Sequence, residues 1–454
     1  AEAPVLEEAL RALGRVAGGP GPWSRERVAS DGRFHVLLRA LSARLTEDCD
    51  ARTLALSADA AARFRAHTPE LTLLLEQAAE AALGRENAFT PRNLTVLALA
   101  LAARGVRGGP TGRAERPEED LGLTVAFVRA EAMRQMQEFD PSCCAALLEA
   151  LRRWGVQDHE LCAMALERVW ETFDELTCRD VVDLLAVMSR LGLARAALLR
   201  RLCGLAFSQL GRFSGPQLVG LLYALARLRF CSARDVDDAL AALLPKLGAL
   251  SDGDVARFLF ALAMMDADRH SAVARVLVVQ YAEGIGPGGG PAADADVAWA
   301  ICALGLAGRY REVLAACLAR SFAPVSPPSA PSARPRLLRL HDVVCAIDLG
   351  LAPLQPPGLV QEVFPPTVWR AAMAEASASE AARLSSTRLH DEVEVCLRAL
   401  PAALQPRRNQ MVGPLHVDFL DKATGLVVDL EIVAWPTTRR IRHELLERSG
   451  YRPL

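Results

Sequence analysis

The chain has 454 residues, of which 51% are hydrophobic and 23% charged, and its formal net charge is -2. This composition is that of a folded protein, and the near-zero net charge excludes a strongly basic nucleic-acid binder as a description of the whole chain, although a local basic face stays open. Aromatic residues make up only 5%, which argues against a β-sandwich or a β-propeller, and Arg, Asp or Pro interrupts every apolar run before it could span a membrane.

The first part of the chain predicts helices of a repeat array. Residues 89–105 are a weak copy of the repeat, and a polar insert at residues 106–120 separates this copy from the next. The repeat then becomes regular over residues 139–282. Four segments align without gaps, and their starts lie 37 residues apart: 139–155, 176–192, 213–229 and 250–266. Such a period indicates stacked supersecondary units.

Each repeat reads as a pair of helices. A polar residue opens the first helix as its N-cap in each copy: Asp140, Thr177, Ser214 and Ser251. Asp180, Gln217 and Asp254 stand three residues further on, as capping-box partners do. Apolar residues follow at helical spacing, and we expect Leu185, Leu222 and Leu259 to be buried at equivalent places. The second helix is predicted over 198–210 in one unit and over 236–247 in the next.

The array weakens towards its C-terminal end. Segments 294–305 and 340–350 are partial copies, while the Gly-rich stretch 283–291 and the Pro/Ser-rich stretch 323–335 read as linkers or exposed loops. The predicted fold is therefore mainly α: an α-solenoid of helical hairpins with a period of about 37 residues over residues 1–405.

The hydrophobic pattern changes after Pro406. Residues 416–420 and 426–433 alternate as strands do, a Gly-containing turn at 422–425 joins them, and a helix is predicted over 438–449. We therefore expect a small α/β module over residues 406–454.

This last stretch resembles a RAP domain. The resemblance rests on Val417-Asp418-Phe419, on Val427-Val428-Asp429-Leu430-Glu431, on Arg439-Arg440 with Leu445, and on Gly450-Tyr451. RAP domains follow arrays of degenerate helical repeats of the octotricopeptide or a related kind. The resemblance implies an organellar RNA-binding protein that acts in RNA processing, translation or ribosome assembly.

RAP domains are similar in turn to restriction-endonuclease-like folds, in which acidic residues bind a metal ion that activates water. Asp418, Asp429 and Glu431 are the corresponding acids here. The position two residues after Glu431 is Val433, where the nuclease folds carry Lys, and the loop after Glu431 is shortened. We therefore expect neither nuclease activity nor any other catalysis, and no catalytic residues.

Arginine carries nearly all the positive charge, since Lys occurs only at positions 246 and 422. Arg153, Arg190 and Arg227 recur at one repeat position. Such a row of guanidiniums suits an RNA backbone, but cations also favour the last turn of a helix, so both roles stay open. A second basic group is Arg407, Arg408, Arg439, Arg440, Arg442 and Arg448, which fits RNA contact or a solvated helix face equally well.

The sequence contains no motif for binding a metal ion or a cofactor. The eleven Cys are scattered without a CxxC pair, so we expect thiols in the core of a protein from a reducing compartment. No phosphate-binding glycine loop occurs either.

Trp154, Trp170 and Trp299 do not recur at one repeat position, and we expect core or end-cap residues there. Contact with RNA should therefore run through phosphates, with little reading of bases.

Three function classes fit these observations. The first is a structural subunit of the mitochondrial ribosome that binds rRNA beside neighbouring proteins, and a near-neutral chain suits such a shared particle. The second is a free organellar factor for RNA processing or stability, and the third is a protein-only helical scaffold. We expect a mitochondrial location, with the plastid as the alternative. Because the chain starts at Ala1 and not at Met, we also expect a processed protein.

Overall fold

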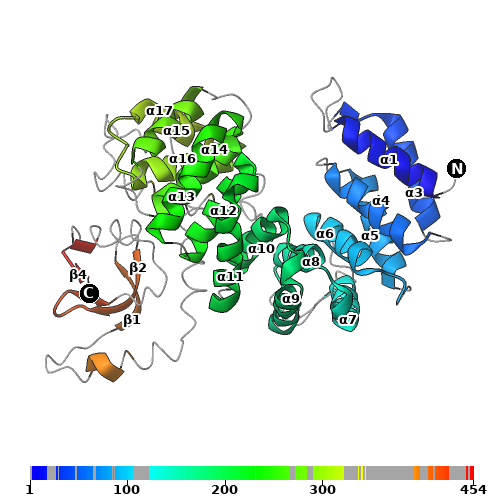
Figure 1. The fold of residues 1–454 in the computed structure, drawn as a ribbon, viewed down its shortest axis with the longest axis horizontal. Coiled ribbons are helices and arrows are strands. Elements are labelled where there is room, and N and C mark those ends of the chain that lie inside the picture. Colours follow the sequence, from blue (N-terminus) through cyan, green and yellow to red (C-terminus); the bar gives the residue numbers. More distant parts are fainter. Residues whose placement is uncertain are drawn as a thin grey trace. The chain divides into compact units, whose positions relative to one another are not determined.

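The structure is a computed structural model of the chain (Figure 1). It forms two compact units, Ala1–Ala206 and Phe207–Leu454. The described residues are 3–17, 27–28, 30–45, 49–64, 68–83, 85, 87–105, 122–156, 158–193, 195–230, 232–265, 271–283, 290–321, 336, 339–340, 343, 393, 395–398, 407–412, 415–428, 446–447 and 450–453.

The first unit is a stack of helices in two rows. One row is α4, α6, α8 and α10, each packed against the next, and α3, α5, α7 and α9 form the other. α1 packs against α3 and α4. The bounds are α1 (Ala3–Ala17), α3 (Gly32–Leu45), α4 (Ala51–Arg63), α5 (Pro69–Leu83), α6 (Pro91–Ala103), α7 (Leu123–Arg134), α8 (Pro141–Trp154), α9 (His159–Glu171) and α10 (Cys178–Leu191), and α11 (Ala196–Ser208) crosses the division between the units.

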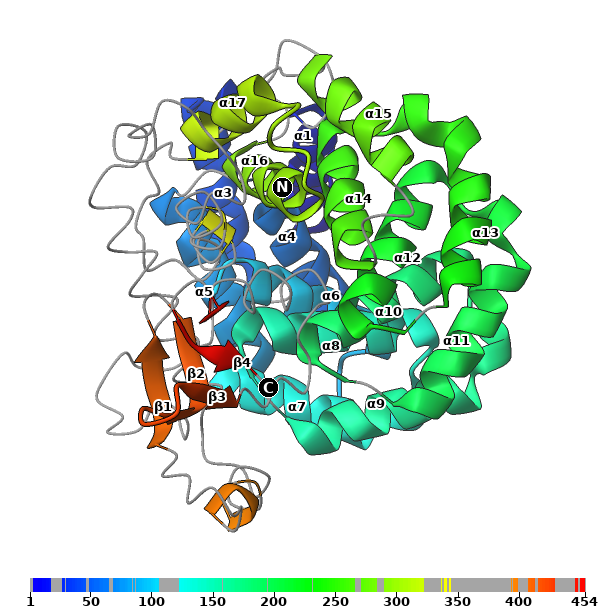
Figure 2. The same cartoon turned by 90° about the vertical axis from the view of Figure 1, so that its left-hand side faces the viewer.

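The second unit continues this helical pattern, as Figure 2 shows. α12 packs against α14 and α14 against α16, while α13, α15 and α17 each pack on the preceding helix of that row. The bounds are α12 (Gly215–Leu228), α13 (Ala233–Leu243), α14 (Asp252–Met265), α15 (Ser271–Glu283), α16 (Gly290–Ala303) and α17 (Arg311–Ser321). Side-by-side hairpins of this kind are the packing of an α-solenoid, which confirms the predicted helical array within each unit.

The predicted N-caps open the helices of the regular repeats. Asp140 accepts a hydrogen bond from the Cys143 backbone N–H at 2.6 Å. The backbone N–H of Thr177 donates to Asp180 at 2.9 Å, and that of Ser214 donates to the Gln217 side chain at 2.9 Å. These contacts satisfy N–H groups that the first turn of a helix leaves without partners.

Short 3₁₀ turns precede the first helix of each regular repeat. They are η1 (Met136–Glu138), η2 (Phe173–Glu175), η3 (Leu210–Arg212) and η4 (Leu244–Ala249). α13 ends at Leu243, earlier than the predicted end at 247, and η4 begins at Leu244. Pro245 has no backbone N–H with which to continue the α-helix. The other second helix is also shifted, since α11 runs over Ala196–Ser208 where the sequence predicted 198–210.

Side chains from the second half of each repeat bond backbone carbonyls near these turns. The Arg168 Nε on α9 donates to the Phe139 carbonyl at 2.9 Å, and the Gln280 side-chain amide on α15 donates to the Leu247 carbonyl at 3.2 Å. The Lys246 Nζ in η4 donates to the Phe213 carbonyl at 2.5 Å. The first and third bonds each satisfy the carbonyl of the residue that opens the same repeat, and only the Gln280 bond joins two consecutive repeats.

The core runs along the middle of each stack. Leu185, Leu222 and Leu259 are all fully buried, as predicted. The other apolar residues of the three predicted stripes are buried too: Val181, Leu184, Met188, Leu218, Leu221, Leu225, Val255, Phe258 and Leu262. Since no single hairpin could bury its apolar face alone, each repeat is stabilised by its neighbours.

The predicted linker at 283–291 is shorter than expected. Glu283 is the last residue of α15, and α16 already begins at Gly290, so only residues 284–289 lie between the helices. Pro291 fits the first turn of α16 because that turn has no need of its missing N–H. The insert 106–120 and the stretch 323–335 lie outside the described residues.

A sheet forms where the sequence predicted an α/β module. β1 (Arg407–Val412), β2 (Leu415–Asp421) and β3 (Leu426–Val428) are antiparallel neighbours, and β4 (Arg452–Pro453) pairs with β3 in parallel. β1 was not predicted. Of the predicted helix 438–449 only Leu446 and Glu447 are described.

Candidate nucleic-acid interface

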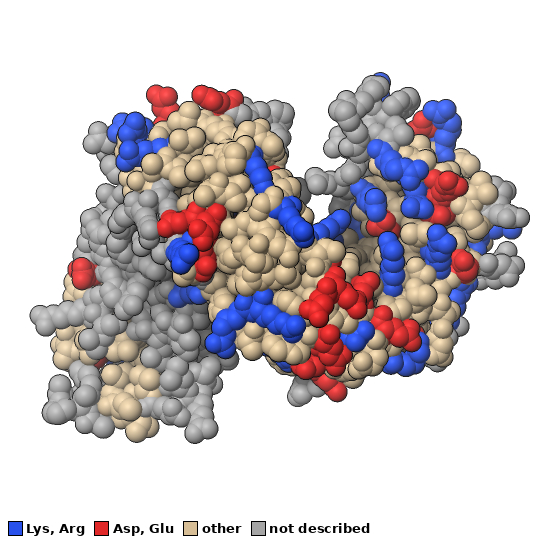
Figure 3. Space-filling model, in the orientation of Figure 1, with Lys and Arg blue, Asp and Glu red and all other residues tan. Residues whose placement is uncertain are grey.

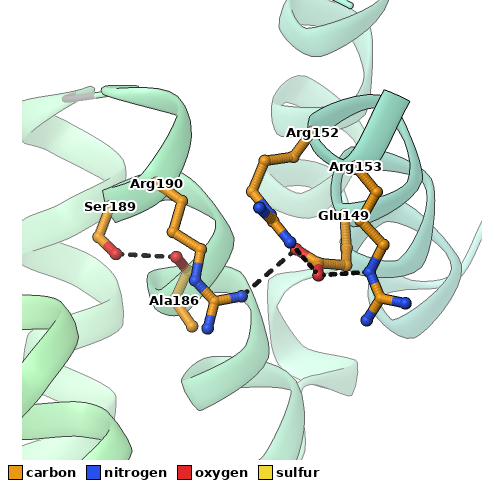
Figure 4. A network of polar contacts seen from close by, with 6 residues as sticks. All are labelled: Glu149, Arg152, Arg153, Ala186, Ser189 and Arg190. Atoms are coloured by element: carbon orange, nitrogen blue, oxygen red, sulfur yellow. Dashed lines mark hydrogen bonds and ion pairs between the residues drawn. The ribbon is translucent and has the colours of Figure 1, made fainter. Parts of the chain in front are cut away.

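Arg153 and Arg190 meet at a common acidic partner, Glu149 (Figure 4). The Arg153 Nε donates to Glu149 Oε1 at 2.8 Å, within α8. From α10, the Arg190 Nη1 lies 3.4 Å from Glu149 Oε2. Arg152 adds two donors, at 2.7 and 2.8 Å. The sequence did not predict this partner, and it takes up hydrogen-bonding capacity that two of the predicted phosphate-binding residues would offer to RNA.

The charge of Glu149 depends on these arginines. Burial alone would raise the pKa of Glu149, but hydrogen bonds from Arg152 and Arg153 and the charges of Arg152 and Arg190 lower it to about 2. Glu149 is therefore ionised at neutral pH and holds the ends of α8 and α10 together. Arg153 and Arg190 also lie in the last turns of their helices, where a cation favours the helix dipole.

Arg227, the third residue of the predicted row, has a different environment. It lies in the last turn of α12, and its Cζ is 5.9 Å from the ring centre of Tyr223 one turn earlier. The buried Nε of Arg227 has no hydrogen-bond partner among the described residues. A buried donor without a partner is unfavourable, so this Nε is a polar group whose burial no described contact offsets.

Three aromatic rings follow one another across α12, α14 and α16, a row that was not predicted from the sequence. The ring centres of Tyr223 and Phe260 are 5.7 Å apart, and those of Phe260 and Trp299 are 4.8 Å apart. Trp299 was expected to be an isolated core or end-cap residue. It is 4% exposed, as a core residue would be, but it also continues the row formed by one repeat position.

Arg339 covers the middle of this aromatic row. Its Cζ lies 3.9 Å from the ring centre of Phe260, and its Nε forms an ion pair with Asp296 on α16. Burial raises the pKa of Asp296, whereas the charges of Arg339, Arg227 and Arg257 lower it, so all three arginines act on this carboxylate. Cationic groups thus lie beside an aromatic row of which Phe260 and Trp299 are buried.

The other predicted aromatic positions are separate from this row. Trp154 is fully buried in α8, as expected for a core residue. Trp170 is 40% exposed and lies under Arg201, whose Cζ is 4.9 Å from the Trp170 ring centre and 3.9 Å from that of Phe173.

The second predicted basic group is described only in part. Arg407 and Arg408 lie in β1, opposite Leu420 and Phe419 of β2, and Arg407 is exposed. Arg439, Arg440 and Arg442 lie outside the described residues, as do Asp429 and Glu431, and of Asp418 only its place in β2 is described. RNA contact through these residues stays a prediction.

None of the described cysteines is in a disulfide, and most of them are buried. Burial raises the pKa of Cys302 and of Cys144 to about 12, so these two are un-ionised at neutral pH. Within the described ranges no group of His, Cys, Asp and Glu is arranged to hold a metal ion. None of the described helices has the length and apolar character that crossing a membrane requires.

Charged side chains are mixed on the face drawn in Figure 3. Basic and acidic groups lie beside one another in small clusters over the described residues of this face, and neither sign dominates it. An extended single-sign field is therefore absent from the described part of this face, which agrees with the net charge of -2.

One protein family matches the centre of the chain. The model of the family described as RNA-editing substrate-binding complex 6 protein matches residues 123–271. The matched stretch is about a third of the chain and runs from the first residue of α7 to the first residue of α15. No curated protein matches the chain. The regular repeats, together with Glu149, Arg153, Arg190 and Arg227, are therefore similar to this family.

Proposed function

We propose that the chain is an RNA-binding helical-repeat protein of a mitochondrial ribonucleoprotein. The observation that carries this proposal is the coincidence of two features in one stretch. The family named for binding RNA-editing substrates matches residues 123–271, and the repeats with Arg153, Arg190 and Arg227 lie inside the same residues. The resemblance of residues 417–451 to a RAP domain supports RNA binding from a separate part of the sequence.

Two assemblies fit this role. The finer proposal is a structural subunit of the mitochondrial ribosome that binds and stabilises rRNA beside protein neighbours, and the near-neutral charge supports it, since the particle shares the work of binding. The second is an RNA-processing or RNA-editing complex, which the matched family favours by its name. In both, Arg residues contact phosphates and the helical rows provide a rigid support.

Sedimentation of an organelle lysate separates these assemblies. A tagged chain that travels with a ribosomal subunit in a sucrose gradient, and crosslinks to rRNA there, supports the ribosomal role. Migration in a lighter particle with other RNAs supports the processing role. Recovery in the plastid fraction would support a plastid location in place of a mitochondrial one. Co-purification with proteins alone, unaffected by ribonuclease, would instead support a protein-only scaffold.

We also propose that the chain has no catalytic activity of its own. The absence of Lys at the position of Val433 supports this part of the proposal. Purified protein incubated with RNA or DNA and Mg²⁺ or Mn²⁺ should leave the substrate intact. Cleavage by the parent that disappears in Glu431→Ala would contradict it.

A further inference from the structure

The half-buried ring of Tyr223 begins the aromatic row that α12, α14 and α16 build in the second unit. Tyr223 and Arg227 are one turn apart on α12, so both side chains lie on the same face of that helix. Phe260 and Trp299 continue the row but are 3% and 4% exposed, so Tyr223 is the member open to a ligand.

The second observation is the charge around the row. Arg227, Arg257 and Arg339 all act on Asp296, and Arg257 also lies 3.5 Å from Asp254. Three guanidiniums and two carboxylates leave this surface with a positive balance. The Nε of Arg227 is also buried without a hydrogen-bond partner among the described residues. The positive balance beside Tyr223 favours an anion there.

Arg339 shows what kind of group the row accepts. Its flat guanidinium lies 3.9 Å from the ring centre of Phe260, which is a stacking distance for a planar group. A nucleobase is planar as well and stacks on aromatic rings regardless of its sequence. Tyr223 therefore offers a ring for stacking, and the guanidinium of Arg227 lies beside it. A nucleotide of an unpaired strand carries the two complementary groups, a base and a phosphate.

We propose that Tyr223 and Arg227 form a nucleotide-binding site for single-stranded RNA, in which a base stacks on the Tyr223 ring and the adjoining phosphate accepts hydrogen bonds from Arg227. Arg257 supplies further positive charge from α14, and Arg339 covers the ring of Phe260. This site rests on the proposed RNA-binding function and gives it a position and a binding mode that includes base stacking.

The test measures binding of the full chain to a labelled, mixed-sequence single-stranded RNA of about 12 nucleotides, as a function of salt. Tyr223→Leu should weaken binding about tenfold, because it removes a stacking ring but keeps an apolar side chain, and Tyr223→Phe should retain the parent affinity. Arg227→Gln should weaken binding and lower the salt slope by about 0.7, the value for one phosphate contact on a single strand.

The chain offers a matched control. Arg309 and Tyr310 form a second Arg–Tyr pair in the same unit, again with 5.9 Å between Cζ and ring centre, in the connection between α16 and α17. Tyr310→Leu and Arg309→Gln should bind RNA as the parent does. A duplex of the same sequence should bind less well than the single strand, since its bases are not free to stack.

The outcomes separate this site from the proposed function. If the parent binds RNA and the variants at 223 and 227 bind as tightly, or the control variants lose as much affinity, the site is wrong and RNA binding stands. If the parent binds no RNA, both the site and the proposed RNA-binding function are wrong. Because Tyr223→Leu could also disturb the fold, crosslinking of the parent to RNA with photoreactive uridines is a second measurement. Crosslinks within residues 215–228 support the site, and crosslinks only elsewhere overturn it.

Discussion

Arg190 on α10 donates to the carboxylate of Glu149 on α8, with 3.4 Å between Nη1 and Oε2. This ion pair joins two consecutive repeats through residues whose side chains are 43% and 17% exposed. Glu149 stands where the backbone phosphate was expected, between guanidiniums at one repeat position. The same arginines can therefore stabilise the stack in the absence of RNA and be drawn towards phosphate when RNA is present.

Replacing Glu149 with Gln should lower the free energy of unfolding by about 1–3 kcal/mol at pH 7, because a partly buried charge network loses its anion. The pKa of Glu149 is about 2 in the folded protein against its usual value of 4.5. The stabilising contribution is thus complete above pH 4.5 and declines as the pH falls from there towards 2. Urea unfolding of parent and variant across that interval should show the difference shrinking. Glu167→Gln is the control, since that side chain is 64% exposed.

The same Glu149→Gln substitution should strengthen RNA binding. Arg153 and Arg190 lose the carboxylate that competes with phosphate, and each added contact should steepen the salt slope by about 0.7. Filter binding or fluorescence anisotropy at several salt concentrations would measure both quantities against Glu167→Gln. Weaker binding by a variant that is still folded would show that Glu149 positions the arginines for RNA and does not compete with it.

Leu222→Ala should lower the free energy of unfolding by about 2–5 kcal/mol, since this fully buried side chain would leave a cavity between α12 and its neighbours. Leu244→Ala is the matched control because Leu244 is 49% exposed, and it should stay within about 0.5 kcal/mol of the parent. Denaturant unfolding followed by circular dichroism would measure both. Equal effects of the two substitutions would contradict the buried core of the helical rows.

Gly192→Ala should destabilise the protein by about 1–2 kcal/mol through its backbone alone. Gly192 ends α10 with a φ of +69°, a left-handed conformation that alanine disfavours, and an added methyl group would meet no atom within 4 Å. Gly204 in α11 has equally open surroundings and no such φ, so Gly204→Ala should stabilise by about 0.4–1 kcal/mol. Melting temperatures that shift in the same direction for both variants would contradict this assignment.

The repeat could be predicted from the sequence because its signals are local and recur. N-caps, capping boxes and leucines at helical spacing return every 37 residues, and each has the same physical cause in every copy. Arg229 shows the limit of such rules. It ends α12 with a φ of +51°, where Gly155 and Gly192 stand in other repeats. Its backbone N–H bonds the Ala226 and Leu225 carbonyls, so the hydrogen bonds that end the helix hold this exposed residue in the left-handed region against its own preference.

The candidate site could not be predicted in the same way. Glu149 is acidic in one repeat only, so its contact with Arg190 depends on how two neighbouring helices pack. The aromatic row was hidden because the residue changes from Tyr to Phe to Trp, and because Trp299 follows Phe260 by 39 residues where Phe260 follows Tyr223 by 37. Stacking tolerates both changes, since it requires only a ring at a given place and not one residue type.

The predicted RNA contacts of Arg439, Arg440 and Arg442 rest on the sequence alone and call for a direct test. Replacing all three with Ala should weaken association with RNA about equally for all sequences, because phosphate contacts do not read bases. If each Arg contacts one phosphate of a single strand, the salt slope should fall by about two units. Replacing Arg33, Arg63 and Arg234 with Ala removes the same charge from side chains that are 86%, 61% and 90% exposed, and serves as the control.

A triple variant at 439, 440 and 442 that binds as tightly as this control would remove the C-terminal module from the RNA interface. A loss confined to one RNA sequence would instead show that these arginines read bases.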